Sequence, residues 1–587
     1  MKQLLLLTSI LMGMFCNEAR ADGFETATQA VQNMGVGWNL GNTLDANNQS
    51  VTNISSASYW GQQGLDSETC WGQPTTTAAL ITMMKNAGFG AIRVPVTWYN
   101  HMDSNGNVDA AWMARVKEVV DYVIDAGLYC IINVHHDTGA DSNNSKHWIH
   151  ASSTSYNNYN SKYVNLWKQI ANEFKDYGEK LLFEGYNEML DEYNSWCWAS
   201  YNYNNTTGSY NSTAATASYN AINNFALSFV NAVRGTGGNN TQRNLIVNTY
   251  AAACGGRWND HCNDPLTKLN KPTGENNHII FEIHTYPNIS NLNTAKTDVA
   301  NMFTDINSYL KTKAPVIIGE WGTSNVDNGS DYANNRTNMI NFLDYFVKKA
   351  KDNNIATFYW MGLTDGVNRS LPAFNQADLA QTIVNAYHGS ISGYQFPTPD
   401  DFQTIYTVNY TQEWSEAFLY GDWNRTAQSL SNYKGILVEM EDDSYAGKLQ
   451  IKVYGVKNGT NPDGSDKFKE QYAQFASGSS STMVTFDASI LGSTFWGVTL
   501  QTLSGAMTAK VKKVTLIKAD NSEISLTVTS AWGCTVTSES TPINTAIQVV
   551  QNDTNVGDGA IYNLNGQRIS NPRKGIYIKN GKKYIQK

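Results

Sequence analysis

From residue 34 to about residue 390, short apolar segments alternate with longer amphipathic ones. The short segments are apolar throughout, which is typical of parallel strands that are covered on both faces. Eight of them are expected as strands: 34–40, 90–96, 129–135, 181–187, 244–250, 278–286, 315–321 and 355–361. Eight strands with helical segments between them predict an α/β fold, a closed (β/α)8 TIM barrel. A doubly wound open sheet is the alternative.

Two of the intervening segments carry a clear helical pattern. Residues 74–89 begin with Pro74 and end near Gly88, which suit the first turn and the end of a helix. Residues 110–128 repeat apolar positions three and four apart and also stop at a glycine. The first strand is followed by neither a GxGxxG nor a Walker sequence, so nothing indicates a nucleotide site.

The pattern changes after about residue 395. The stretch "QFPTPDDFQ" (395–403) reads as a linker, and the next 140 or so residues show alternating strands without a convincing helix. Gly, Asn and Asp turns separate these strands, a combination that predicts a β-sandwich. Residues 560–587 add three short strands and two Asn-Gly turns. We therefore expect a barrel over 22–394, a sandwich over 395–545 and a small C-terminal β segment over 546–587.

The first 21 residues predict an export signal. One lysine precedes an apolar run of about a dozen residues, and Ala19-Arg20-Ala21 follows as a cleavage site. The run is too short to span a bilayer permanently. A lipid anchor on Cys16 is the alternative, which the bulky Phe15 before it disfavours. We expect a secreted or cell-surface protein with no membrane span.

Composition narrows the kind of partner. The net charge is −9, only 16% of residues are charged, and no basic run precedes the tail, so nucleic acid is not expected. The chain has 16 Trp and 32 Tyr, many in polar loops such as 194–205, and such loops suit sugars. The six cysteines after the leader follow no metal-binding spacing. Cys254 and Cys262 are close enough in sequence to bridge, and Cys70 with Cys197 is a second conceivable pair.

The ends of the predicted strands collect the candidate chemistry, since a (β/α)8 barrel builds its active site there. The polar and aromatic residues at these ends are Asn39, Asn42, Arg93, His135, His136, Asn187, Glu188, His284, Tyr286, Glu320 and Trp360. Glu188 and Glu320, from the fourth and seventh strands, suggest the carboxylate pair of a glycosidase. Arg93 and Tyr286 suit an ionised partner, and Asn187 suits the sugar 2-hydroxyl. No metal or cofactor is required.

Other residues have competing interpretations. A metal site at "HHD" (135–137) is disfavoured because neighbouring strand residues point to opposite faces. Glu184 and Glu282 lie inside their strands and are expected as barrel-interior partners for arginine or backbone. Two interpretations are open for both Asn42 and Asp45: each caps a turn, or each contacts the ligand. Four loop tryptophans stack on sugars or pack loops, with Trp148 the first candidate for stacking: Trp148, Trp196, Trp198 and Trp258.

Six motifs in order resemble the signatures of glycoside hydrolase family 5: "GWNLGNTLDA" (37–46), "IRVPVTW" (92–98), "NVHHD" (133–137), "EGYNEM" (184–189), "HTY" (284–286) and "IIGEWG" (317–322). The resemblance implies that Glu188 is the acid/base and Glu320 the nucleophile. It also implies a set of residues around the substrate, with Trp360 as the floor and His136 on the wall: Arg93, His135, His136, Asn187, His284, Tyr286 and Trp360. "SETCWGQP" (67–74) resembles the subfamily of endoglucanases, lichenases and xyloglucanases.

The expected function is that of a secreted, retaining endo-β-1,4-glucanase acting on cellulose or mixed-linkage β-glucan. A xyloglucanase, mannanase or xylanase of the same mechanism is the alternative, as is a non-catalytic glycan-binding protein. The sandwich binds polysaccharide through Trp423, Tyr433, Trp496 or Trp532, or it is a rigid spacer. Residues 562–583 resemble the sorting tails of type IX secretion in Bacteroidota, which implies recognition by the secretion machinery; a stable hairpin without a receptor is the alternative.

Overall fold

The computed structural model describes residues 23–47, 64–139, 147–203, 210–274, 277–323, 329–390 and 394–543, together with four short strands within 561–586. The main part of the chain divides into two compact units between Pro397 and Thr398. The expected leader, 1–21, lies outside the described residues. Among the described helices, none has the length and apolar character that a bilayer crossing would need.

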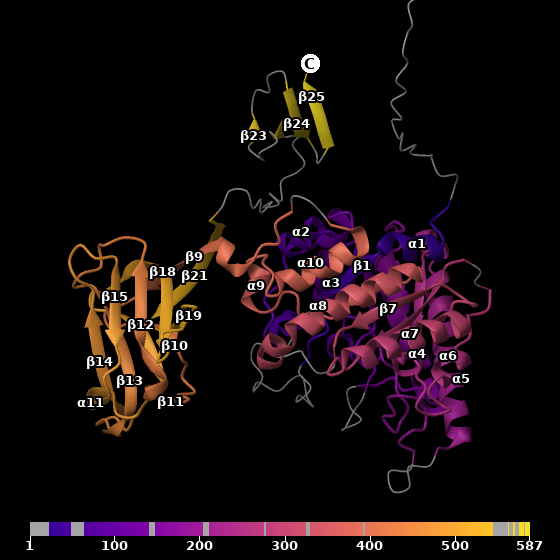
Figure 1. Ribbon diagram of the computed structural model, residues 1–587, viewed down its shortest axis with the longest axis horizontal. Coiled ribbons are helices and arrows are strands. Elements are labelled where there is room, and N and C mark those ends of the chain that lie inside the picture. Colours follow the sequence, from indigo (N-terminus) through magenta and orange to yellow (C-terminus); the bar gives the residue numbers. More distant parts are fainter. Residues whose placement is uncertain are drawn as a thin grey trace, which may run out of the picture. The chain divides into compact units, whose positions relative to one another are not determined.

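The first unit is a closed barrel of eight parallel strands in chain order (Figure 1). The strands are β1 (Val36–Asn39), β2 (Ala91–Val94), β3 (Tyr129–Asn133), β4 (Leu181–Glu184), β5 (Leu245–Asn248), β6 (Ile279–Thr285), β7 (Val316–Trp321) and β8 (Ala356–Tyr359). The sheet closes because β1 pairs with both β2 and β8. The predicted (β/α)8 fold is confirmed, and the open-sheet alternative is wrong.

Helices surround the strands on the outside, as the ribbon in Figure 1 shows. They are α1 (Ala27–Met34), α2 (Ala78–Ala87), α3 (Ala110–Asp125), α4 (Ser153–Glu173), α5 (Ser212–Arg234), α6 (Asp264–Lys268), α7 (Leu292–Tyr309), α8 (Gly329–Asp352), α9 (Val367–Ser370) and α10 (Ala377–His388). The expected start of a helix at Pro74 is wrong. Helix α2 begins four residues later because the Thr77 side chain accepts a hydrogen bond from the Leu80 amide. Gly88 ends it with a left-handed φ of 104°, as predicted.

The barrel interior changes from apolar to polar along the strands. One layer consists of buried apolar side chains, among them Ala91, Ile131, Leu182, Ile246, Ile280, Ile317 and Phe358. Two residues further along six of the strands, the inward positions are fully buried and polar: Asn39, Arg93, Asn133, Glu184, Asn248 and Glu282. Because strand residues two apart share a face, this polar layer lies on top of the apolar one, under the mouth of the barrel. The fold thus supplies a rigid polar base for the strand-end residues.

The second unit consists of antiparallel sheets with their own apolar core. Its strands are β9 (Phe402–Tyr410), β10 (Glu416–Tyr420), β11 (Gln428–Ser429), β12 (Tyr433–Met440), β13 (Leu449–Thr460), β14 (Asp466–Gln474), β15 (Ser481–Thr485), β16 (Thr494–Phe495), β17 (Gly497–Thr502), β18 (Met507–Lys518), β19 (Glu523–Leu526), β20 (Thr529–Trp532) and β21 (Cys534–Pro542). The larger sheets run β14-β13-β17-β10-β20 and β15-β12-β18-β9-β21, with β19 on β18. One helical turn, α11 (Ala488–Leu491), departs from the expected all-strand pattern because Asp487 caps it.

Near the C-terminus the structure has four short strands where the sequence predicted three. They are β22 (Ile561–Tyr562), β23 (Arg568–Ile569), β24 (Gly575–Lys579) and β25 (Lys582–Gln586), in the order β23-β22-β24-β25. All six cysteines after the leader are free in the described structure. Neither of the two bridges considered from the sequence forms.

Candidate active site

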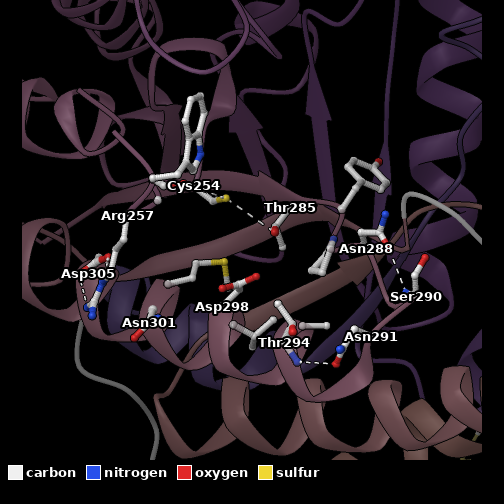
Figure 2. Close-up of a pocket in the computed structure, with 18 residues that line it drawn as sticks. Cys254, Arg257, Thr285, Asn288, Ser290, Asn291, Thr294, Asp298, Asn301 and Asp305 are labelled. Atoms are coloured by element: carbon white, nitrogen blue, oxygen red, sulfur yellow. Dashed lines mark hydrogen bonds and ion pairs between the residues drawn. The ribbon is translucent and has the colours of Figure 1, made fainter. Parts of the chain in front are cut away.

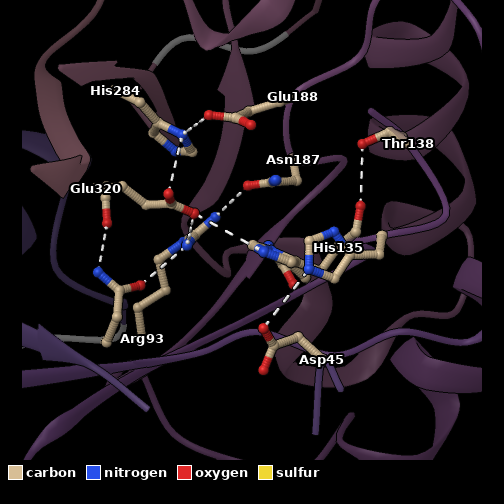
Figure 3. Close-up of polar contacts among 12 residues, drawn as sticks. Asp45, Arg93, His135, Thr138, Asn187, Glu188, His284 and Glu320 are labelled. Atoms are coloured by element: carbon tan, nitrogen blue, oxygen red, sulfur yellow. Dashed lines mark hydrogen bonds and ion pairs between the residues drawn. The ribbon is translucent and has the colours of Figure 1, made fainter. Parts of the chain in front are cut away.

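Arg93 is the centre of a buried hydrogen-bond network at the mouth of the barrel (Figure 3). It donates to both oxygens of Glu184, at 2.6 and 2.8 Å, and lies 3.5 Å from Glu282. The remaining donors reach Asn39 Oδ1 and Glu320 Oε1 at 2.9 Å each, and Asn187 Oδ1 at 2.7 Å. The expectation that Glu184 and Glu282 are arginine partners is confirmed.

Glu320, in β7, is held as an anion by three neighbours. The Tyr286 hydroxyl donates to its Oε2 at 2.8 Å, and Arg93 donates to its Oε1. His284 Nδ1 lies 3.6 Å from Oε2. Burial by itself would raise the pKa of Glu320, but the charges of His284 and Arg93 and these hydrogen bonds outweigh burial and lower it. An ionised carboxylate is what a nucleophile needs.

His284, at the end of β6, joins the second carboxyl group to the network. Its Nδ1 donates to Glu188 Oε1 at 2.9 Å, and its Nε2 donates to Glu282 Oε1 at 3.1 Å. Burial opposes its charge, but Glu320, Glu188 and Glu282 together raise the pKa of His284 to about 10. Its ring therefore carries protons on both nitrogens and fixes the position of Glu188, which is 22% exposed to the cleft.

The two carboxyl groups face each other across the mouth (Figure 3). One carboxylate oxygen each of Glu188 and Glu320, with a ring nitrogen of His284, lie within 4.8 Å of one another. In retaining glycosidases the catalytic carboxyl groups are about 5–5.5 Å apart, and in inverting ones about 6.5–9.5 Å. The separation fits direct attack by one carboxylate and leaves too little room for a water between them.

The amide of Asn187 has one orientation. Its Oδ1 accepts from Arg93 at 2.7 Å, and its backbone oxygen accepts from the Asn248 side chain at 3.1 Å. The amide Nδ2 is therefore the group left to meet a sugar hydroxyl. Sequence reasoning missed Asn248, which sits at the end of β5; its strand-end position was the available signal.

The side chain of Asn133 determines the tautomer of His135. Asn133 Oδ1 accepts from the Val96 amide at 3.0 Å, so Asn133 Nδ2 faces His135 Nδ1, also at 3.0 Å, and donates to it. The His135 proton is then on Nε2, 3.9 Å from Glu320 Oε1. Burial, followed by the charges of His136 and Arg93, lowers the pKa of His135, so the ring stays neutral. Asn133 was also missed, although it stands in the "NVHHD" motif.

Trp360 follows β8 and lies parallel to His135, with 5.9 Å between ring centroids and 6° between planes. A side chain at Gly41 would come within 2.9 Å of the Trp360 ring, so only glycine fits beside the indole. The partly buried Trp360 thus has the position expected of a floor under a sugar ring.

The sequence disfavours a metal at "HHD" because His135 and His136 are expected to point to opposite faces of a strand, and that expectation is wrong. Strand β3 ends at Asn133, so His135 and His136 do not point to opposite faces, and their centroids are 4.5 Å apart. Ligand atoms of Asp45, His135 and His136 lie within 4.8 Å of one another. However, His135 Nδ1 already accepts from Asn133 and its Nε2 holds the proton, so it has no lone pair free for a metal. The donor set does not favour a metal.

Asn42 lies in the turn after β1 with a φ of 58°. Asp45 stabilises the same turn by accepting from the Thr43 amide at 2.8 Å, and its other oxygen lies 3.7 Å from His136 Nε2. The turn role expected for Asp45 is confirmed, and substrate contact by Asn42 stays a prediction. His136 is also tilted against Trp71, a wall residue that sequence reasoning did not select, with 5.3 Å between centroids.

Trp148 packs a loop. Its Nε1 donates to Asp137 at 2.6 Å, and Lys162 Nζ lies 4.7 Å from the centroid of its ring. These contacts favour the packing alternative that the sequence left open, so sugar stacking by Trp148 has no support beyond the sequence. Trp196 and Trp258 are 45% and 64% exposed, whereas Trp198 is buried.

The segment 64–76 forms a wall fixed at two points. Glu68 accepts two hydrogen bonds from Arg115 of α3, both at 2.8 Å, and one from the Thr76 amide. Gln73 bonds Asp365 and accepts from the Gly366 amide in the loop after β8. The "SETCWGQP" motif thus connects the loops around Trp71 to the barrel.

Comparisons with known proteins agree with this geometry. Residues 44–364 match the family described as Cellulase (glycosyl hydrolase family 5). Endoglucanase A of Clostridium longisporum is 32% identical over 393 residues, covering 63% of this chain and 68% of that protein.

Two solved structures are similar as well. A GH5-4 broad specificity endoglucanase from an uncultured bacterium is 57% identical, with a TM-score of 0.59, over 64% of this chain and 98% of that one. A family 5 enzyme from Prevotella bryantii, in complex with a xyloglucan tetradecasaccharide, is 40% identical, with a TM-score of 0.53, over 62% of this chain and 99% of that one. The family match spans more than half of the chain, and with the carboxylate pair at the barrel mouth it leads to one conclusion: this protein belongs to glycosyl hydrolase family 5 and is a glycoside hydrolase.

Proposed function

We propose that this glycoside hydrolase is a retaining endo-β-1,4-glucanase with Glu188 as acid/base and Glu320 as nucleophile. The observation that carries the proposal is the approach of the two carboxyl groups to within 4.8 Å, with Glu320 held as an anion. The similar proteins named as endoglucanases support internal cleavage of a β-glucan. The xyloglucan complex of the Prevotella relative supports branched β-glucan as a second substrate.

In the first step, a Glu320 oxygen attacks the anomeric carbon while the bond to the leaving oxygen breaks. Glu188 transfers its proton to that oxygen, so the leaving sugar departs with a free hydroxyl. Asn187 Nδ2 contacts the 2-hydroxyl, an interaction that strengthens in the transition state. The result is a glycosyl ester on Glu320.

In the second step, water takes the place of the leaving sugar. Glu188, now ionised, accepts a proton from the water while the water oxygen attacks the anomeric carbon. Glu320 leaves as a carboxylate, which Arg93 and Tyr286 again stabilise. Two inversions return the anomeric configuration of the substrate.

Substitution of each carboxylate tests the proposal. We expect Glu188→Gln and Glu320→Gln to lower kcat on soluble carboxymethylcellulose at least about 10³-fold with unchanged melting curves. Glu192→Gln, an exposed glutamate four residues after Glu188, is the matched control and should retain activity. Product NMR should show the β-anomer first. Near-normal turnover of both variants, or an α-anomer, would refute the assignment.

For the second unit we propose polysaccharide binding on the outer face of the five-stranded sheet. Trp532, Glu416, Gln501 and Gln450 lie opposite one another on neighbouring strands and so share one face. Gln450 donates to Gln501, and Gln501 donates to Glu416, both at 2.7 Å. All three of these polar side chains are buried, so the exposed indole of Trp532 beside them is the group that suits the apolar face of a sugar.

Among the four aromatic candidates in this unit, Trp423 and Trp532 are each 50% exposed. Trp496 is buried and Tyr433 is partly buried, so those two are not suited to stacking on a sugar. We expect Trp423→Ala with Trp532→Ala in the full chain to lower retention on insoluble cellulose at least fivefold. Met483→Ala, exposed on the other sheet, is the control, and equal retention of all variants would favour a spacer.

Export is also a proposal. The N-terminal run and the basic C-terminal segment support secretion or display at the cell surface through a sorting machinery. Mass spectrometry of the protein recovered outside the cells of its source tests both ends. A mature N-terminus at Asp22 is expected, and protein retained inside the cells with residue 1 in place would contradict it.

A further inference from the structure

Strand β7 departs from the regular strand pattern at its catalytic residue. Residues two apart in a strand share a face, and Ile317 belongs to the apolar layer inside the barrel. Gly319 therefore holds the place in β7 that polar side chains fill on six other strands. Glu320 follows directly and should point outwards to the helices. Instead, its carboxylate accepts a hydrogen bond from Arg93 inside the mouth at 2.9 Å.

The pairing of β7 with its neighbours contains one extra residue. Ile283 of β6 pairs with Ile318 of β7. The next residue of β6, His284, already pairs with Glu320, so Gly319 has no partner on β6. The register between β7 and β8 shifts in the same part of β7. An extra residue of this kind is a β-bulge, which changes the direction of the side chain beside it.

The extra residue belongs to β7, because the alternation along β6 is regular. Glu282 and His284 face the interior, where they are hydrogen-bonded to each other at 3.1 Å. Between them, Ile283 belongs to the separate apolar core outside the strands. Thr285 also faces away from the interior, since its hydroxyl accepts from Cys254 Sγ at 3.7 Å beside α7 (Figure 2).

The side chains around the bulge show two consecutive inward positions. A side chain on Gly319 would lie 1.5 Å from Glu282 Oε1, so this position faces the interior and the Glu282 carboxyl group occupies it. Glu320 faces the interior as well. Trp321 then faces outwards and stacks on Phe346 of α8, with 4.2 Å between ring centroids. The bulge is thus what brings the Glu320 carboxylate into the cleft.

A buried amide from β1 holds this bulge. Asn39 Nδ2 donates to the Gly319 carbonyl at 2.9 Å and to the Phe358 carbonyl at 3.1 Å. Asn39 Oδ1 accepts from Arg93 at 2.9 Å, so the amide has one orientation. The same nitrogen of Arg93 donates to Glu320 Oε1. The backbone and the side chain of the bulge are therefore connected through one amide and one guanidinium group.

We propose that Asn39 is a positioning residue for the nucleophile: its amide holds the bulge at Gly319 and so keeps the Glu320 carboxylate in the cleft. Asn39 acts through the backbone of β7 and through Arg93, and it carries no step of the reaction itself. The proposal rests on the retaining mechanism proposed above, in which Glu320 attacks the anomeric carbon. Without the amide, Glu320 should shift, and a misplacement of about 1 Å costs about 100-fold in rate.

The experiment measures the attack by Glu320 separately from proton transfer. The probe is 2,4-dinitrophenyl 2-deoxy-2-fluoro-β-cellobioside. Glu320 attacks its anomeric carbon, and dinitrophenolate leaves as an anion that needs no proton from Glu188. The fluorine slows the second step, so the glycosyl ester on Glu320 accumulates. Mass spectrometry then gives both the rate constant of labelling and the final extent of labelling per chain.

We expect Asn39→Ala to lower the rate constant of labelling about 100-fold, while the final extent still reaches one label per chain. A purely structural defect would instead lower the extent and leave the rate constant of the folded fraction unchanged. Glu188→Gln should label at a rate close to that of the wild type. The matched control is Asn244→Ala, which should stay within about twofold of the wild type. Asn244 is also buried, and its Nδ2 donates to the Glu25 carbonyl at 3.0 Å, before the start of β5 and far from the mouth.

Gly319→Ala disturbs the same bulge from the side of Glu282 and should also label slowly and completely. It decides the question if Asn39→Ala does not fold. Labelling of either folded variant at the wild-type rate constant, whether to full or to reduced extent, would overturn the proposal. A wild type that is not labelled on Glu320 refutes the assignment of the nucleophile itself.

Discussion

Arg93 and Asn133 act at the residue scale by determining how other side chains are oriented. Every N–H of Arg93 has an acceptor, and two of these acceptors are Glu320 and Asn187. Asn133 fixes the tautomer of His135 in the same way. Preorganised donors and acceptors avoid reorganisation during the reaction. The two buried polar residues therefore support the site without carrying the chemistry.

His284 makes stability depend on pH. Its pKa is about 10 in the folded protein and near 6.5 when unfolded, so it binds a proton more tightly in the folded state. Its contribution is complete below pH 6.5 and is lost as the pH rises through 10. We expect the melting temperature of the wild type to exceed that of His284→Gln most at pH 6, with the gap shrinking towards pH 10. A gap that stays constant or widens over this range would contradict the charged ring.

At the scale of elements, β7 must pass very close to β6. A methyl group on Gly319 would lie 1.5 Å from Glu282 Oε1 and 2.3 Å from its Cδ, inside the barrel. Glu282 is fully buried between Arg93 and His284, so its carboxyl group has no solvent to move into. We expect Gly319→Ala to lower the free energy of unfolding by about 3 kcal/mol, as measured by denaturant titration.

The matched control for β7 is Gly178→Ala, where nothing lies within 4 Å of the added carbon. Gly178 is exposed and has no positive φ, so its substitution should change stability by about 0.5 kcal/mol or less. Equal effects of the two substitutions would show that Glu282 can move aside.

The strands were predictable because their apolar runs and polar ends are local properties of the sequence. The residues chosen at those ends, such as Arg93 and Glu320, do meet at the mouth. Asn133 and Asn248 could have been selected by their positions at strand ends, but their roles could not be derived from the sequence, since these depend on which side chains face them across the closed barrel. Both Pro74 and Thr77 are residues that can start a helix, and in the structure α2 starts after the Thr77 cap. The bulge in β7 depends on its pairing with β6 and β8, which the sequence of β7 alone does not show.

At the scale of the whole molecule, the chain has two units with separate apolar cores. The barrel core and the sandwich core share no residue, and the chain divides between Pro397 and Thr398. Proteins with several domains depart from two-state unfolding when each core can melt alone. Each unit is therefore expected to unfold as its own cooperative transition.

Calorimetry of the full chain tests this separation by substitutions in one unit at a time. Leu500, fully buried in the sandwich core, pairs with Ile451, and Leu500→Ala should lower the stability of that transition by about 3 kcal/mol. Gly319→Ala should lower the melting temperature of the barrel transition and leave the sandwich transition unchanged, because the sandwich core contains no residue of β7. Activity on soluble carboxymethylcellulose should be lost as the barrel unfolds, in the transition that Gly319→Ala shifts. If one transition shifts in both variants, or if activity is lost with the melting of the Leu500→Ala sandwich, the two cores are coupled and the separation is wrong.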